Sequence, residues 1–588
     1  MAVVLRVIRL ALASAVAGVL IAAIVLPAVG GAGVTVVSVT RELRIAPEEL
    51  DEPPLPERTV VLDKNGKQIA QFYYQYRQSV PLSKVADVMK KAIVEIEDAR
   101  FYEHGAIDPE GLARALWKNL QSGGVNEGGS SITQQYVKQV LVNKAKTKKE
   151  AAAAIAPTVS RKLNELRHAL AIEEKYSKDE ILEKYLNISY FGAGAYGIEA
   201  AAKRFFGKHA SELKLHEAAT LAGAVQNPTL TDPSRGKEFR ERLLARRNVV
   251  LDVMYKGGKI TYEELVAAKK KKLGYKGYDI SGGCERSKYP YFCLYVQHEI
   301  LNNKAFGKTV KERRELLTRG GLTIRTTIDP HMQKAAERAI RQYVKPSDKP
   351  VAAEALVEPG TGRIKAMAAS RRFGNNKKKN ESNYNLVADS AHGGGAGFQA
   401  GSTFKVFTLA TALEKGMRFG DGFEVGGTYQ AAGYHTFRNC KGDRVGDPNH
   451  VVHNASGEGG GGFKNLQTGT WGSVNTFFMK LQERVGLCDV VKMAKRLGIK
   501  RADGKKLGEY ETFTLGINEM DPVTVASAYA TFGARGTYCK PMAITSVTDR
   551  NGKKIEFKPD CKQVLEPEVA DAVNHILSGV FTKGTMSG

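Results

Sequence analysis

Residues 97–105 read Glu-Asp-Ala-Arg-Phe-Tyr-Glu-His-Gly and follow a segment with apolar residues at helical spacing. The apolar positions are Val85, Met89, Ala92, Ile93 and Ile96. This spacing predicts an amphipathic helix that ends where the acidic pair Glu97 and Asp98 begins. The segment therefore gathers acidic, aromatic and histidine side chains at one helix end.

Further polar segments follow in the same region. Residues 129–135, Gly-Ser-Ser-Ile-Thr-Gln-Gln, form a hydroxyl- and amide-rich start to a helix, which would present N–H groups and hydroxyls to an anion. Residues 161–165, Arg-Lys-Leu-Asn-Glu, open another helix, and residues 177–180 fit a capping box.

Each segment alone has an ordinary structural interpretation. Glu97 fits a solvated helix end, Arg161 and Glu165 fit an i,i+4 ion pair, and residues 130–135 fit a capped helix. Their occurrence together, in this order, favours a functional site.

In order and spacing these segments resemble the signature blocks of the family 51 peptidoglycan glycosyltransferases, which have a mostly α, lysozyme-like fold. The matching segments are 97–105, 129–135, 161–165, 176–187, 190–207 and 221–228. Ser131 stands where the family more often has Thr, so a hydroxyl is retained.

The resemblance implies roles for individual residues. Glu97 would be the general base that takes a proton from the acceptor sugar hydroxyl, and Glu165 the second essential acid, near the lipid pyrophosphate. The donor side would be lined by Ser130, Thr133, Gln134, Gln135, Lys138, Arg161 and Lys162. The reaction would polymerise lipid II with inversion into β-1,4 glycan strands. No cofactor is required, although Mg²⁺ or Mn²⁺ would also stabilise the departing pyrophosphate.

A second candidate site begins at Ser402, with Lys405 three residues on, at the start of a strongly apolar helix. If Lys405 is desolvated, its pKa falls and it can take the serine proton. The alternative is a purely structural role, in which Ser402 caps the helix and Lys405 is solvated. Ser473-Val474-Asn475 supplies a second element, and the two together resemble the first two of three signatures of penicillin-binding and serine β-lactamase folds.

That resemblance implies Ser402 as the acylated nucleophile, Lys405 as its base, Ser473 as a proton relay and Asn475 as the group that orients the peptide amide. The third signature, Lys-(Thr/Ser)-Gly, is missing, and Lys583-Gly584-Thr585 has its letters in the wrong order. We therefore expect the α/β transpeptidase domain to be incomplete, with the chain stopping before that motif.

The domains expected are a cytoplasmic tip and transmembrane anchor at 1–45, a glycosyltransferase domain at 55–250, a linker region at 251–320 and the transpeptidase domain at 321–588. No charged residue lies between Arg9 and Arg41, and about 20 apolar residues span a bilayer. Arg6 and Arg9 precede this stretch, so the positive-inside rule places the N-terminus in the cytoplasm and the catalytic domains outside. A cleavable signal peptide is the alternative.

The net charge of +25 fits three kinds of surface: one that binds nucleic acid, one that is merely soluble, or one that is attracted to anionic membrane, pyrophosphate or wall polymer. The apolar N-terminus favours the last. An even number of cysteines outside the membrane suggests disulfides, with buried free thiols as the alternative. Neighbours in the sequence suggest Cys284–Cys293 and Cys539–Cys561, which leaves Cys440–Cys488. No cysteine or histidine motif indicates a metal site.

The leading interpretation is a class A, bifunctional penicillin-binding protein. The partners expected are lipid II, nascent glycan, stem peptides, β-lactams, the membrane, and cell-wall synthesis or division proteins, but no nucleic acid. The alternatives are a glycosyltransferase with a degenerate serine domain, a membrane-anchored β-lactam sensor, and a lysozyme-like hydrolase.

Overall fold

The computed structural model describes residues 52–108, 110–111, 130–145, 147–156, 158–455 and 461–587. Within these ranges, no helix is both long enough and apolar enough to cross a membrane. The anchor predicted within residues 1–45 lies outside the described residues. The chain folds as two compact units. Unit 1 contains Tyr73–Ile280 together with the residues up to Arg58, and unit 2 contains Thr59–Phe72 and Ser281–Gly588.

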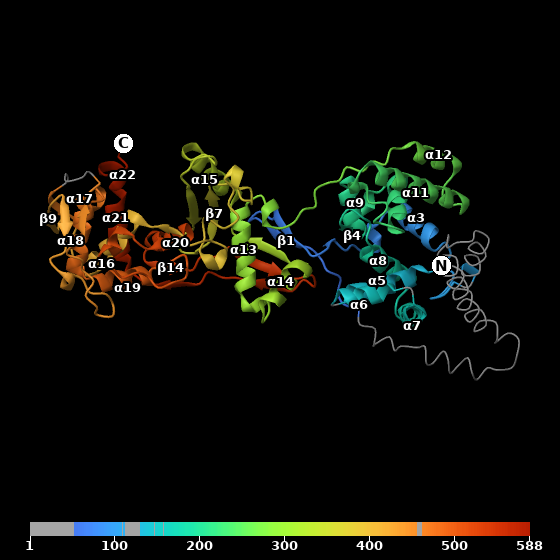
Figure 1. Ribbon diagram of the computed structural model, residues 1–588, viewed down its shortest axis with the longest axis horizontal. Helices are drawn as coiled ribbons and strands as arrows, with labels where there is room; N and C mark the ends of the chain where they lie inside the picture. The colour runs from blue at the N-terminus through green and yellow to red at the C-terminus, as the bar shows by residue number, and fades with distance from the viewer. Residues whose placement is uncertain are drawn as a thin grey trace, which may run out of the picture. The chain divides into compact units, whose positions relative to one another are not determined.

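Unit 1 is mostly helical, as the sequence predicted (Figure 1). Its two short strands are β3 (Tyr76–Arg77) and β4 (Ala195–Tyr196), which pair in parallel. Its main helices are α3 (Asp87–Glu97), α5 (Ile132–Lys144), α6 (Lys148–Ile155), α7 (Val159–Lys175), α8 (Lys178–Ile188), α9 (Ile198–Phe206), α10 (Leu215–Val225), α11 (Lys237–Lys256) and α12 (Tyr262–Lys270).

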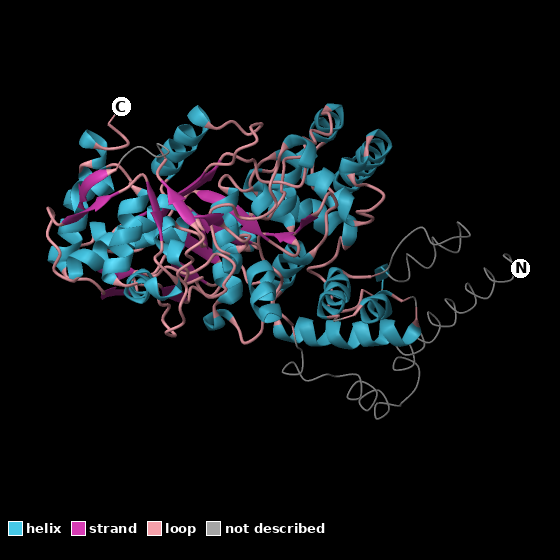
Figure 2. Cartoon of the chain, turned by 60° about the vertical axis from the view of Figure 1, so that its left-hand side comes forward, coloured by secondary structure: helices cyan, strands magenta, loops and turns pink. Residues whose placement is uncertain are grey.

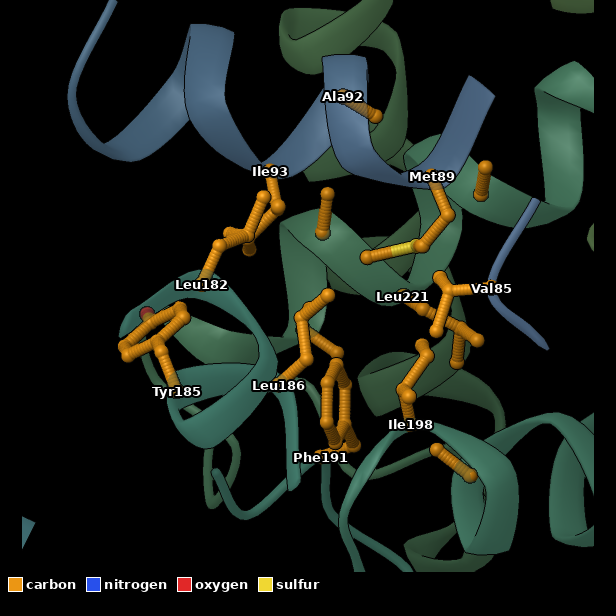
Figure 3. Close-up of a cluster of buried hydrophobic side chains, with 14 of the residues drawn as sticks. Val85, Met89, Ala92, Ile93, Leu182, Tyr185, Leu186, Phe191, Ile198 and Leu221 are labelled. Atoms are coloured by element: carbon orange, nitrogen blue, oxygen red, sulfur yellow. The ribbon is translucent and has the colours of Figure 1, made fainter. Parts of the chain in front are cut away.

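The apolar face of α3 organises the core of unit 1. Met89, Ala92 and Ile93 are fully buried, and Figure 3 shows them directed toward side chains of α8, α9 and α10, among them Leu182, Ile198 and Leu221. Burial of this face fixes the end of α3, where Glu97 stands. The capping box predicted at Ser177 and Glu180 is present at the start of α8. Helix α12, with its own capping box at Thr261, lies within residues 251–320, which the sequence analysis treats as a linker region.

Unit 2 contains most of the described strands, drawn magenta in Figure 2. Its largest sheet has the order β16-β15-β5-β1-β2. The strands are β1 (Thr59–Leu62), β2 (Gln68–Phe72), β5 (Thr323–Thr326), β15 (Ile544–Thr548) and β16 (Lys554–Glu556). Strands β1 and β5 pair in parallel, and the other neighbours pair antiparallel. Although β1 and β2 precede the described α-helices of unit 1 in the sequence, they belong by packing to unit 2.

Beside this sheet lie α13 (Pro290–Asn302), α14 (Val310–Arg319) and a hairpin of β6 (Ala353–Val357) and β7 (Ile364–Ala369). The β-like runs at 352–357 and 364–369 flank the turn Glu358-Pro359-Gly360-Thr361-Gly362, a sequence pattern that predicts a hairpin, and the structure has one there. Helix α15 (Pro330–Tyr343) packs on it.

The rest of unit 2 is a helical cluster with short two-stranded sheets at its edges. Its helices are α16 (Lys405–Glu414), α17 (Leu466–Trp471), α18 (Asn475–Val485), α19 (Leu487–Arg496), α20 (Pro522–Gly533), α21 (Pro567–Ser578) and α22 (Val580–Lys583). Its strands are β8 (Phe398–Gln399), β9 (Gly422–Val425), β10 (Thr428–Gln430), β11 (Val451–His453), β12 (Gly462–Asn465), β13 (Glu519–Met520), β14 (Thr537–Cys539) and β17 (Cys561–Gln563).

All six cysteines form disulfides, and the pairs are those suggested by the sequence. Cys284 bonds to Cys293, Cys440 to Cys488 and Cys539 to Cys561. The last pair joins directly opposed residues of β14 and β17. Disulfides persist in oxidising compartments, so these bonds agree with an extracytoplasmic location.

Candidate active sites

Glu97 is the last residue of α3, and its two carboxylate oxygens have different environments. Oε2 accepts a hydrogen bond from Gln135 Nε2 at 2.8 Å, and Gln135 Oε1 accepts one from the buried Tyr185 hydroxyl at 3.1 Å. Oε1 is buried and has no hydrogen-bond partner among the described residues. A hydrogen bond therefore holds Oε2 in place, while Oε1 keeps its capacity to accept a proton.

Burial raises the pKa of Glu97 above its usual value. The Gln135 hydrogen bond and the charges of Arg246 and Lys138 oppose that rise, and the neighbouring Asp98 adds to it. A raised pKa brings a carboxylate closer to the range in which a general base is effective.

Glu165 is placed differently, on α7 with almost no exposed surface. One of its oxygens pairs with Arg161 Nη1, and the other accepts from Lys162 Nζ at 2.6 Å. Lys162 Nζ also donates to Ser130 Oγ and Gln134 Oε1, each at 2.8 Å. Both oxygens of Glu165 are thus bound to cations, so this carboxylate organises positive charge and is not itself an open base.

Neighbouring residues of α5 connect these two clusters. Gln134 contacts Lys162, and Gln135 contacts Glu97. Successive residues of a helix point about 100° apart, so a single turn reaches two sites. Lys138, one turn further along, is the shared electrostatic neighbour of Glu97 and Lys162. Thr133 instead donates to Glu173.

The expectation that the start of α5 offers free N–H groups to an anion is wrong for two of them. Ile132 N–H donates to Asp98 Oδ2 at 3.0 Å, and Gln134 N–H donates to Ser131 Oγ at 3.3 Å. The protein's own caps satisfy these groups. The positive charge beside the start of α5 belongs instead to the side chain of Lys162, which contacts Ser130 and Gln134, and to the neighbouring Arg161.

The residues present do not fit a resident divalent cation at Glu165, because both carboxylate oxygens already pair with cations. In the described part of the chain, Asp98, His104 and Asp108 bring three ligand-type atoms within 4.8 Å of one another. Asp98 is occupied by His104 and Ile132 N–H, and Asp108 pairs with Arg100, so protein partners already use these groups.

In unit 2 three of the four predicted residues, Lys405, Ser473 and Asn475, meet around the Lys405 ammonium, whereas no hydrogen bond of the Ser402 hydroxyl to this group is present among the described residues. Nζ donates to the Ser473 carbonyl oxygen at 2.6 Å, to Ser473 Oγ at 3.0 Å and to Asn475 Oδ1 at 2.6 Å. These contacts account for the three donors of an ammonium group. Burial lowers the pKa of Lys405 to about 8. A neutral lysine is therefore accessible near physiological pH.

The backbone at Ser473 is strained in a way that serves this contact. Its φ of 48° lies in the left-handed region, which a non-glycine residue adopts at a cost of roughly 1–2 kcal/mol. The turn directs both the carbonyl and the hydroxyl of Ser473 toward Lys405. Asn475 begins α18, and its Nδ2 donates to the His453 carbonyl at the end of β11 at 2.8 Å.

Ser402 lies in a 3₁₀ turn, Gly401–Phe404, that leads directly into α16. The serine is exposed, whereas Lys405 is buried one turn later. The turn is held by Gly401 N–H, which donates to the Gly516 carbonyl at 3.1 Å, and by the Tyr529 hydroxyl, which donates to the Thr403 carbonyl at 2.8 Å.

Lys583-Gly584-Thr585 does not form a strand. Lys583 ends α22 and lies over the Trp471 ring, 5.3 Å from its centre, and Thr585 N–H donates to the Trp471 carbonyl. This agrees with the interpretation that the segment is not the third signature.

Sequence reasoning missed Tyr185 and Arg246, which act on Glu97 through Gln135 and through charge. Tyr185 lies inside a segment that was recognised, but nothing in the spacing singled out its hydroxyl. Arg246 lies on α11, beyond the recognised segments.

Comparison with known families agrees with both sites. The transglycosylase family model matches residues 65–255. The model for the penicillin-binding protein transpeptidase domain matches residues 353–588.

Relatives and a solved structure are similar to this chain over most of its length. The chain is 31% identical over 570 residues to penicillin-binding protein 1A/1B of Bacillus subtilis, which covers 95% of this chain and 56% of that protein. It is 30% identical over 512 residues to penicillin-binding protein 1A of Mycobacterium tuberculosis, covering 84% of this chain and 56% of that protein. The chain thus spans little more than half the length of these relatives. The crystal structure of penicillin-binding protein 1A from Haemophilus influenzae has the same fold, with a TM-score of 0.54 at 18% identity over 91% of this chain and 82% of that one.

The chain therefore carries a transglycosylase region followed by a penicillin-binding protein transpeptidase region, and in this arrangement it is similar to the class A penicillin-binding proteins.

Proposed function

We propose that this protein polymerises lipid II into glycan strands and cross-links their stem peptides through an acyl-serine intermediate. The observation that carries the first activity is the contrast between two buried carboxylates. Glu97 keeps one oxygen open, while both oxygens of Glu165 are bound to cations. One group is suited to take a proton and the other to hold positive charge beside a leaving group.

In the proposed transfer, Glu97 Oε1 accepts the proton of the acceptor sugar hydroxyl as that oxygen attacks the anomeric carbon of the donor. The bond from the anomeric carbon to the lipid pyrophosphate breaks, and the pyrophosphate leaves with the bonding electron pair. Arg161 and Lys162 stabilise the charge that develops there. No step is routed through a divalent cation, because the donor set at Glu165 does not fit one.

In the second activity, neutral Lys405 takes the proton of Ser402. The serine oxygen then attacks the carbonyl of the penultimate D-alanine, and the terminal D-alanine departs after receiving a proton relayed by Ser473. An amine of a second stem peptide resolves the ester. The same acylation by a β-lactam would give a stable adduct at Ser402.

Membrane anchoring, with both units outside the cytoplasm, belongs to the same proposal. The uncharged stretch between Arg9 and Arg41 and the three disulfides support it. The lipid tails of both glycosyl substrates give anchoring a chemical reason. The assembled cluster around Lys405 speaks against the alternative of a degenerate serine domain.

The test of the glycosyltransferase assignment is Glu97→Gln, which keeps the shape of the side chain and removes the base. The expected result is loss of polymer from labelled lipid II, with acylation of Ser402 by a fluorescent penicillin unchanged. Ser402→Ala is the matched control. It should abolish acylation by the fluorescent penicillin and leave polymer formation from lipid II unchanged. Polymer formation by Glu97→Gln at the wild-type rate would refute the role of Glu97, and muropeptide fragments in place of polymer would indicate a hydrolase.

A further inference from the structure

Gln482 is a fully buried residue of α18 whose carboxamide forms hydrogen bonds on both sides. Nε2 donates to the Glu511 carbonyl at 2.5 Å, and Oε1 accepts from Thr514 N–H at 3.0 Å. Both partners belong to the 3₁₀ helix Glu511–Leu515. In such a helix the carbonyl of one residue and the N–H of the third residue after it lie close together. One side chain of α18 therefore binds both ends of a single 3₁₀ turn.

The same 3₁₀ helix contacts the turn that carries Ser402. The Phe513 ring packs edge-on against the Phe404 ring with 5.3 Å between their centres, and both rings are fully buried. Directly after the helix, the Gly516 carbonyl accepts from Gly401 N–H at 3.1 Å. Phe404 and Gly401 are the two ends of the serine turn. The place of the nucleophile therefore depends on where this 3₁₀ helix lies.

These contacts come from the helix faces that also carry the proposed catalytic groups. Gln482 follows Asn475 by seven residues, close to two turns, so the two side chains share a face of α18. Thr408 follows Lys405 by three residues, so these two share a face of α16. The buried Thr408 hydroxyl forms a hydrogen bond of 2.7 Å with the Thr514 hydroxyl. Polar contacts thus join the 3₁₀ helix to both helices.

The position of Ser402 is not set by a bond to its proposed base. Among the described residues, its hydroxyl forms no hydrogen bond with the Lys405 ammonium, whereas Ser473 and Asn475 both do. The packing of the turn therefore decides where the hydroxyl lies. Helices α16 and α18 also pack directly on each other. Apolar packing has no preferred direction, whereas the two hydrogen bonds of Gln482 fix both the distance and the orientation of the 3₁₀ helix.

We infer that Gln482 is a positioning residue for the acylation of Ser402. By fixing the 3₁₀ helix, it holds the serine turn at a set distance from the Lys405 ammonium. It acts through backbone groups of the 3₁₀ helix and not on the substrate. This role belongs to the proposed transpeptidase function and rests on it.

Gln333 offers a matched control in the same unit. It is buried on α15, and its carboxamide binds the backbone of β7 in the same way. Nε2 donates to the Met367 carbonyl and Oε1 accepts from Met367 N–H, each at 2.8 Å, and Nε2 also donates to Glu337 at 2.9 Å. None of these partners belongs to the serine turn, α16 or α18.

The experiment measures acylation of the full-length protein in detergent by a fluorescent penicillin, for wild type, Gln482→Met and Gln333→Met, well below each melting temperature. Methionine keeps the length of the side chain and removes its hydrogen bonds, so both variants should melt below wild type. At saturating penicillin, the acylation rate constant of Gln482→Met should fall on the order of tenfold, because small displacements of a reacting group have large effects on rate. Its final labelled fraction should match wild type. Gln333→Met should keep both the rate constant and the labelled fraction.

The two readouts separate positioning from stability, because unfolded molecules lower the labelled fraction and leave the rate constant of folded molecules unchanged. An unchanged rate constant in Gln482→Met overturns the inference, and so does an equal fall in Gln333→Met. If Gln482→Met does not fold, Gln482→Asn and Gln333→Asn are compared by the same criteria, since the shorter amide weakens the same contacts and keeps the site polar. If wild type is not labelled at Ser402, the proposed transpeptidase function fails, and that outcome is distinct from these.

Discussion

At the scale of single residues, both sites depend on buried ionisable groups whose partners set their protonation. Glu97 has one bonded and one open oxygen, whereas Lys405 has a partner for each of its three N–H bonds. Burial acts in opposite directions on the two, since it raises the pKa of the acid and lowers that of the base. Both shifts bring the groups closer to neutral pH.

The pKa of Lys405, about 8, predicts the pH dependence of serine acylation. The neutral amine is the active form and exists above the pKa, so the rate should rise with pH and level off above about pH 8. The measurement is the rate of fluorescent penicillin labelling between pH 6 and 9.5. Lys405→Arg should abolish labelling throughout, because a guanidinium does not lose its proton. Lys480→Arg is the control that should leave the profile intact, because this partly exposed lysine of α18 donates to the Glu424 carbonyl and does not contact Lys405 among the described residues. A rate independent of pH would contradict Lys405 as the base.

At the scale of elements, the turn that carries Ser402 depends on a close backbone contact with the 3₁₀ helix Glu511–Leu515. Gly516 ends that helix with φ of 76°, and a Cβ there would lie 2.1 Å from the Gly401 carbonyl oxygen. The backbone next to the nucleophile would have to move to accept any side chain. Gly516 therefore determines how closely the backbone approaches the turn that carries Ser402.

Gly516→Ala should consequently slow acylation of Ser402 by on the order of tenfold or more, because small displacements of a reacting group have large effects on rate. Gly416→Ala is the matched control. It also has positive φ, but a Cβ there would meet no heavy atom within 4 Å among the described residues. Both variants should lose about 1–2 kcal/mol of stability from the left-handed backbone. Equal acylation rates in the two variants would show that the contact is unimportant.

The features that the sequence predicted correctly are those that depend on interactions between residues close in the chain. The capping box at Ser177, the β6–β7 hairpin and all three disulfide pairs involve residues close in sequence or left over by elimination, and all three predictions were confirmed. The effect of the Arg246 charge on Glu97 connects two helices that are far apart in the sequence. The pairing of β1 with β5 likewise joins two strands that are separated in the sequence by residues 73–280. Neither leaves a periodic or spaced pattern, so neither could be predicted from one sequence.

At the scale of the whole molecule, the larger part of unit 1, Tyr73–Ile280, is inserted in the sequence between the two parts of unit 2. Strands β1 and β2 contribute Val61, Ile69 and Phe72 to a buried cluster that also contains Ile324 and Val547. A substitution near the start of the described chain should therefore damage the unit that carries the serine.

Val61→Asp tests this, since Val61 is fully buried and an unpaired carboxylate there costs several kcal/mol. On heating, the variant should lose penicillin acylation at a lower temperature than wild type, while glycan polymerisation survives. Val85→Asp, in the core of unit 1, should have the opposite effect. The measurements are calorimetry and, after heating to a series of temperatures, the residual penicillin acylation and glycan polymerisation of each variant and of wild type. If Val61→Asp loses polymerisation first, residues 59–72 belong to the stability of unit 1.

The β1–β2 pair is also synthesised long before the strand with which β1 pairs in the largest sheet. Thr59 and its partner Leu322 are 263 residues apart, so at about 5–20 residues per second the ribosome makes β1 roughly 13–50 s before β5 exists. Until then the two strands have only each other, and a lone hairpin is marginally stable and has unpaired edges. Nascent chains would need a chaperone or rapid export to keep this apolar ribbon from pairing with its neighbours. The strand that is made first is thus exposed for longest.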